Sequence, residues 1–138
     1  MKNHAYLIMA HNEFRLLDKL ISILDNPDAD IYVHIDKKAK YSLEQLKETK
    51  KSRIYILKRN NVSWGGSSQM FCELELLKSA IKREYKYYHL LSGVDFPLKT
   101  QDEIKAFFEK NNNKEFIRFD HAAIERGSHI DRVKYYYL

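Results

Sequence analysis

The sequence is poor in the residues that build stapled, disordered or membrane-spanning chains. Its 138 residues include one cysteine, two prolines and four glycines. A lone cysteine excludes an internal disulfide and a cysteine-based metal cluster, and so few glycines and prolines argue against a low-complexity chain. Cys72 falls within a helical pattern, which favours a small buried residue over a nucleophile.

Long hydrophobic runs are also missing. No run approaches the roughly 20 apolar residues that span a bilayer. The run near the N-terminus covers about six residues before His11, Asn12 and Glu13, which is too short for the apolar region of a signal peptide. We therefore expect a cytoplasmic protein.

Charge is present in both signs. The chain has 24 Lys and Arg against 19 Asp and Glu, a net charge of +5. A basic balance attracts anions such as nucleotide phosphates, nucleic acid or acidic lipid. The positive and negative residues are interleaved along the chain. Alternating aromatic residues such as those in "KYYHLL" belong more often to a core than to a platform for base stacking. We expect no nucleic acid as a partner, although a basic nucleic-acid-binding domain stays the least favoured alternative.

Apolar patterning predicts alternating strands and helices. Strands are expected over 5–10, 31–36, 53–57, 85–92 and 115–119, and helices over 13–24, 69–84 and 102–110, with a weak helix at 43–48. Short connections between these elements indicate one α/β domain over residues 1–138, with a mostly parallel sheet. Such sheets bind ligands at the carboxyl ends of their strands.

Three polar residues follow predicted strands: His11, Asp36 and Asp95. Together they indicate a site at one rim of the sheet. For Asp36, in "HIDKK", two interpretations stay open: a carboxylate that binds a sugar hydroxyl or base, or a turn former beside solvated lysines. The loop "SWGGSS" offers Gly65 and a helix start for close approach to a ligand. Alone this signal is weak, and Trp64 is also compatible with a core residue.

Motifs for other chemistries are weak or absent from the sequence. The Asp-x-Asp at residues 28–30 lies in a turn that enters a strand, so it indicates turn chemistry. There is no Gly-x-Ser-x-Gly elbow and no Cys/His nucleophile arrangement. A structural or surface role is expected for the histidines, which show no metal-ligand spacing: His4, His11, His34, His89, His121 and His129.

Five segments in order carry a resemblance: "AYLIMAHNE", "LLDKLISIL", "IYVHIDKK", "VSWGGSSQ" and "YHLLSGVDFPLKT". Together they resemble the core-2/I-branching β-1,6-N-acetylglucosaminyltransferase family, which includes the peptide O-xylosyltransferases. The resemblance covers residues 4–119. It implies a GT-A-like, Rossmann-type fold and inverting transfer of N-acetylglucosamine or xylose from a UDP-sugar to a glycan or protein hydroxyl. It also implies no cofactor and no divalent metal.

The resemblance also suggests roles for single positions. It matches Met9 to a residue that contacts uridine, Asp36 to an acid that binds uracil or ribose, and Asn61 to a uridine-side position where relatives have Tyr. It places "SGVDFP" where most GT-A enzymes have a metal-binding acid pair. The residues expected to bind the donor are Met9, His11, Asp36, Asn61, Trp64, Gly65 and Asp95, and those near acceptor positions are Asp120 and Arg132.

The family's catalytic Glu and its diphosphate-binding cations lie further along the chain than "DRVKYYYL". We therefore expect no catalytic residue here: the chain would be the donor-binding half of a truncated enzyme. An inactive nucleotide-binding module is the alternative. By analogy with bacterial relatives, which usually build surface polysaccharide, peripheral contact with an acidic inner membrane is expected.

Overall fold

The structure, a computed structural model, describes residues 2–112, 114 and 116. Strands and helices alternate, as the sequence predicts. In chain order they are β1 (His4–Ala10), α1 (Phe14–Leu24), β2 (Ala29–Ile35), the 3₁₀ turn η1 (Leu43–Gln45), β3 (Ile54–Ile56), α2 (Ser67–Ala80), the 3₁₀ turn η2 (Ile81–Arg83), β4 (Tyr87–Ser92) and α3 (Gln101–Lys110). The strand predicted over 115–119 lies outside the described residues, apart from Phe116.

The strands form a four-stranded sheet among the described residues, in the order β3-β2-β1-β4. Every neighbouring pair is parallel, and β1 lies between β2 and β4 with Met9 opposite both His34 and Ser92. All four carboxyl ends therefore point to the same edge of the sheet. The parallel α/β fold predicted from the sequence is confirmed.

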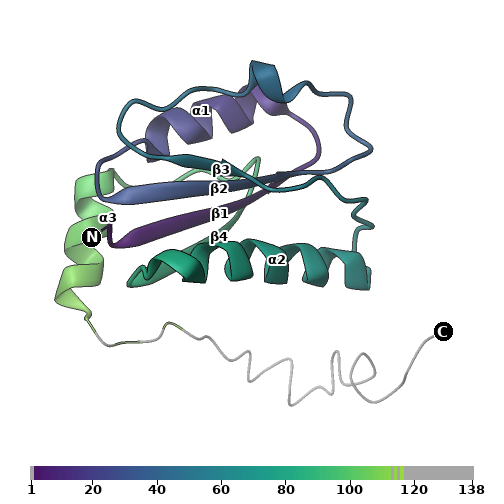
Figure 1. The fold of residues 1–138 in the computed structure, drawn as a ribbon. Helices are drawn as coiled ribbons and strands as arrows, with labels where there is room; N and C mark the ends of the chain where they lie inside the picture. The colour runs from purple at the N-terminus through teal and green to yellow at the C-terminus, as the bar shows by residue number, and fades with distance from the viewer. Residues whose placement is uncertain (1, 113, 115, 117–138) are drawn as a thin grey trace, which may run out of the picture. The chain divides into compact units, whose positions relative to one another are not determined.

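Helix α1 covers one face of the sheet (Figure 1). Its apolar residues recur at helical spacing, so one stripe is buried while the opposite side is polar. The buried residues of α1 are Leu17, Leu20, Ile21 and Leu24, and they pack on inward-facing residues of β1 and β2 that include Ile8 and Val33. This layer fixes the position of the β1–α1 turn that carries His11.

Helix α2 covers the other face (Figure 1). Cys72, Leu76 and Ala80 recur every four residues and pack against Leu7 and Tyr32 of the sheet. Burial raises the pKa of the Cys72 thiol to about 11, which keeps it protonated. The prediction of a small buried cysteine is therefore confirmed.

Residues 1–105 form one compact unit, and a second unit begins at Ala106. The expected single domain over residues 1–138 stays a prediction. Within the described part of the chain, no helix combines the length and the apolar character needed to cross a membrane.

Candidate functional site: a cavity at the carboxyl edge of the sheet

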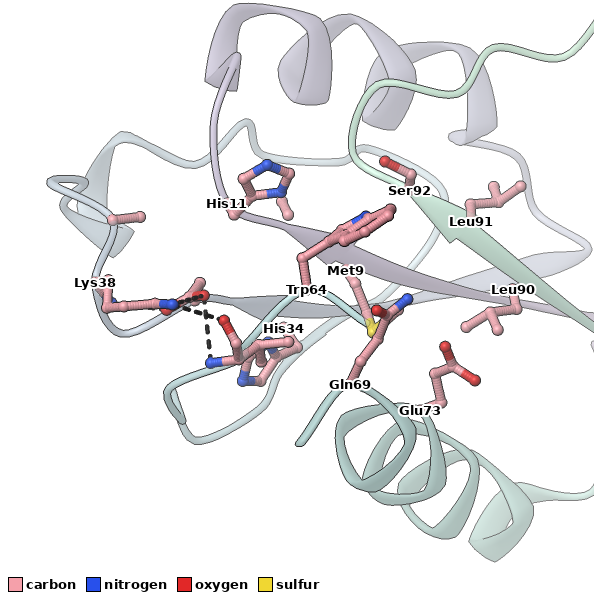
Figure 2. A pocket seen from close by; sticks show the side chains of 14 residues that line it. Met9, His11, His34, Lys38, Trp64, Gln69, Glu73, Leu90, Leu91 and Ser92 are labelled. Atoms are coloured by element: carbon pink, nitrogen blue, oxygen red, sulfur yellow. Dashed lines mark hydrogen bonds and ion pairs between the residues drawn. The ribbon is translucent and has the colours of Figure 1, made fainter. Parts of the chain in front are cut away.

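A cavity of about 590 Å³ opens where β1, β2 and β4 end. The loop before α2 and the first turns of α2 form its other wall, and Figure 2 shows the labelled side chains around it. Its lining is mixed: apolar side chains from the strands lie beside acidic, basic and amide groups. The lining residues are Met9, Ala10, His11, His34, Asp36, Lys38, Ala39, Val62, Trp64, Gln69, Glu73, Leu90, Leu91 and Ser92.

The Asp36 carboxylate holds two loops together at the end of β2. Its Oδ1 accepts the backbone N–H of Lys38 at 2.8 Å, and its Oδ2 accepts that of Val62 at 3.3 Å. The Lys38 ammonium lies 3.7 Å from Oδ2 and donates to the Val62 carbonyl at 2.7 Å. Asp36 is only 6% exposed, so these contacts satisfy a largely buried charge. They show the turn-forming role that the sequence left open, at a residue that also lines the cavity.

His34 is the penultimate residue of β2, two positions before Asp36, and is almost fully buried. Its Nε2 accepts the backbone N–H of Asn60 at 3.1 Å, so that nitrogen carries no proton. Burial lowers the pKa of His34, with the Asp36 carboxylate opposing the shift and the Arg59 guanidinium supporting it. The neutral imidazole therefore carries its proton on Nδ1, while Nε2 is bound to the Asn60 main chain.

The "SWGG" segment is a tight turn that exposes its tryptophan. Gly66 N–H donates to the Ser63 carbonyl at 3.1 Å, and Gly65 adopts the left-handed conformation (φ +69°) that glycine tolerates best. Trp64 is 96% exposed and lines the cavity, so the core alternative for it is wrong. An exposed indole ring at a cavity mouth offers a flat apolar surface to a sugar or base.

The turn is also anchored to the start of α2. The Gly65 N–H donates to Gln69 Oε1 at 3.2 Å, and the Ser63 N–H donates to Ser68 Oγ at 2.8 Å. Gly66, with no side-chain cap, precedes the helix. The Ser68 hydroxyl therefore holds the Trp64 turn in place and does not cap α2.

Asp95 closes the turn after β4. Its Oδ2 accepts the backbone N–H of Ser92 at 2.7 Å, and its own N–H donates to the Ser92 carbonyl at 3.1 Å. The side chain is exposed and does not line the cavity. The Asp95 carboxylate therefore orients the backbone of this turn.

The structure brings four of the expected donor-binding residues to the cavity: Met9, His11, Asp36 and Trp64. Gly65 shapes the turn beside it, while Asn61 and Asp95 lie outside its lining. The acceptor-side candidates Asp120 and Arg132 lie outside the described residues. Sequence reasoning missed the α2 wall, Gln69 and Glu73, although their four-residue spacing next to the loop places both on one helix face.

The Asp-x-Asp motif lies away from the cavity. Asp30 is the second residue of β2, at the opposite edge of the sheet. There its buried carboxylate accepts from Lys2 Nζ at 2.6 Å and from the Tyr85 hydroxyl at 2.7 Å. Across residues 2–112, 114 and 116, no three His, Cys, Asp or Glu side chains converge as metal ligands.

A family model for "Core-2/I-Branching enzyme" matches residues 4–135. The chain belongs to this family. Its fold is GT-A-like, and the family is one of glycosyltransferases. The resemblance inferred from the five ordered segments is therefore confirmed over a longer range than those segments cover.

Two curated relatives illustrate the range of this family. The chain is 30% identical over 141 residues to human N-acetyllactosaminide beta-1,6-N-acetylglucosaminyl-transferase, covering 95% of this chain and 33% of the relative. It is 26% identical over 139 residues to rat xylosyltransferase 2, covering 94% of this chain and 16% of the relative. The chain thus spans a third or less of each relative.

Proposed function

We propose that this Core-2/I-branching chain binds the UDP-sugar donor of an inverting, metal-independent glycosyltransferase. The enzyme would transfer N-acetylglucosamine or xylose to a hydroxyl of a glycan or protein. One observation carries the proposal: a cavity at the carboxyl edge of a parallel sheet gathers Met9, His11, Asp36 and Trp64. This is the edge at which open α/β sheets bind nucleotides.

The chemistry of the lining supports a nucleoside better than a bare diphosphate. Met9, Val62 and Leu90 give apolar contact for a flat ring, and Trp64 adds an aromatic face. Among the residues that the structure describes, Lys38 is the one lysine or arginine that lines the cavity. Its ammonium already lies against Asp36 and the Val62 carbonyl. Neutralisation of the diphosphate is therefore assigned to groups beyond this cavity.

Calorimetric titration of UDP in EDTA tests the donor site and its independence from metal together. Saturable binding, weakened by Asp36→Ala, is expected. Inorganic pyrophosphate is the matched ligand control, because it lacks the nucleoside that the cavity would contact. Failure of UDP to bind a demonstrably folded chain would contradict the proposal.

An inactive nucleotide-binding module shares this cavity and is the second candidate. The chain spans a third or less of each of these relatives, so experiment has to separate donor binding from transfer. We expect little or no release of UDP from UDP-N-acetylglucosamine or UDP-xylose when an acceptor sugar is added to the isolated chain. Robust turnover would show that the chain carries its own base and is not such a module.

The net charge of +5 supports a further part of the proposal, peripheral contact of a cytoplasmic protein with an acidic membrane. Cosedimentation with phosphatidylglycerol vesicles but not with phosphatidylcholine vesicles is the expected result. Binding that persists unchanged in 1 M salt would contradict an electrostatic origin, because salt screens surface charge.

A further inference from the structure

The α2 wall of the cavity carries two polar side chains one helical turn apart. Gln69 and Glu73 both line the cavity, and Figure 2 shows both rising from α2 toward Met9 and Leu90. Both are half-buried, so an interaction they make with a ligand is less weakened by water than one at the open surface.

Gln69 is oriented by the loop it contacts. Because the Gly65 N–H donates to Oε1, the amide oxygen is fixed and the Nε2 group remains to donate to a ligand. Gln69 therefore contributes a donor to the wall.

Glu73 differs from the other acid of the cavity. Both carboxylate oxygens of Asp36 accept main-chain N–H groups, and one also faces Lys38. Glu73 has no hydrogen-bond or ion-pair partner among the residues that the structure describes. It is thus the carboxylate with unused acceptor capacity in the cavity.

We propose that Glu73, with Gln69 beside it, recognises an uncharged hydrogen-bond donor of the bound nucleoside. That donor is a ribose hydroxyl or the imide N–H of uracil. A carboxylate repels phosphate, so the diphosphate lies away from α2 and the nucleoside lies against it. The inference rests on the proposed donor-binding function and assigns Asp36 chiefly to building the loops around the ligand.

The test compares UDP with 2′-deoxy-UDP, 3′-deoxy-UDP and N3-methyl-UDP, by calorimetry on the full chain. Wild type is expected to bind the analogue that lacks the recognised donor about ten- to a hundred-fold more weakly than UDP, as for a hydrogen bond to a charged group. The analogue affected identifies the ribose or the base. Glu73→Ala is expected to reduce the ratio of the two dissociation constants, analogue over UDP, to about one.

Glu75→Ala is the matched control. Glu75 lies on the same helix, is exposed and pairs with Lys78 at 3.0 Å, so its removal changes the net charge equally without altering the cavity. It should keep the wild-type ratio, and circular dichroism should show both variants folded. If wild type fails to bind UDP, the proposed function fails. If wild type binds UDP but discriminates against no analogue, or Glu73→Ala keeps the discrimination, this inference alone is overturned.

Discussion

Gly93 lies against Ala10 so closely that a β-carbon at position 93 would lie 2.8 Å from the Ala10 β-carbon and 3.2 Å from its α-carbon. The Gly93 N–H donates to the Met9 carbonyl at 2.8 Å, which extends the pairing of β4 with β1 by one residue. The glycine after β4 is therefore required for close approach, and it lets the chain turn at Asp95 with the two strand ends still joined beside the cavity.

Gly93→Ala should destabilise the fold. The Ala10 β-carbon is fixed to the backbone and cannot rotate away, so the strands must separate; overpacking of this kind costs about 1–3 kcal/mol. Urea denaturation followed by circular dichroism measures the loss. Gly66→Ala is the control, because its new β-carbon would meet nothing closer than 3.4 Å. Equal losses of stability in the two variants would contradict the explanation by close approach of position 93 to Ala10.

Asp36→Asn should loosen the loop that carries Val62. An amide can keep one acceptor, but its NH₂ group would face the second N–H donor, and a lost hydrogen bond to a buried charged group costs about 1–3 kcal/mol. Faster amide hydrogen exchange at Val62 and lower stability in urea are expected.

Asp95→Asn is the matched control for that change. Asp95 also accepts a main-chain N–H, at 2.7 Å, but its side chain is exposed and water can replace the carboxylate. Asp95→Asn should therefore lower the free energy of unfolding less than Asp36→Asn does. A larger loss at Asp95 would show that burial does not decide the energetic role of Asp36.

The rim of the site was predictable from the sequence because it depends on strand ends. Apolar runs that stop at His11 and Asp36 mark the carboxyl edge of a parallel sheet, and the structure places both residues at one cavity. The α2 wall was less predictable. Which face of α2 points to the sheet is set by Cys72, Leu76 and Ala80, yet exposed apolar residues such as Met70 and Leu74 on its other face obscure the period.

Individual contacts were beyond the sequence for a different reason. The same carboxylate in a turn can bind a ligand or the backbone, and only the placement of the loop around Val62 decides which donors reach Asp36. Likewise, glycine beside Trp64 is compatible with a buried or an exposed ring. The left-handed Gly65 turns the chain so that the ring lies at the surface.

Stability should fall as the pH is lowered from about 6.5 to 4.5. Burial lowers the pKa of His89 to about 4, and the His4 ring, whose Nδ1 lies 3.0 Å from His89 Nε2, adds to the shift. Burial also lowers the pKa of His34. In this window the unfolded chain binds more protons than the folded chain, so protonation favours unfolding. Urea denaturation at half-unit pH steps measures the slope.

The acidic groups act at lower pH and can be separated from the histidines. Main-chain N–H groups of the Lys50–Ser52 turn lower the pKa of Asp25 despite its partial desolvation, so its contribution is lost only as the pH falls below the usual aspartate range. A flat stability profile between pH 6.5 and 4.5 would contradict the neutral, buried histidines.

Trp64→Ala should separate ligand binding from folding. The ring is 96% exposed, so its loss removes little buried surface and should change stability by less than about 0.5 kcal/mol. If the ring stacks on the ligand, UDP-sugar affinity should fall about five- to a hundred-fold, the range for stacking on an aromatic side chain. Trp64→Phe should retain part of the affinity because it keeps an aromatic face. Unaltered affinity in Trp64→Ala, measured by calorimetry, would assign the exposed ring a function other than contact with the donor.

Trp64 is the sole tryptophan of the sequence, so its fluorescence reports on ligand binding at this ring. The fluorescence of wild type should change on titration with UDP-N-acetylglucosamine.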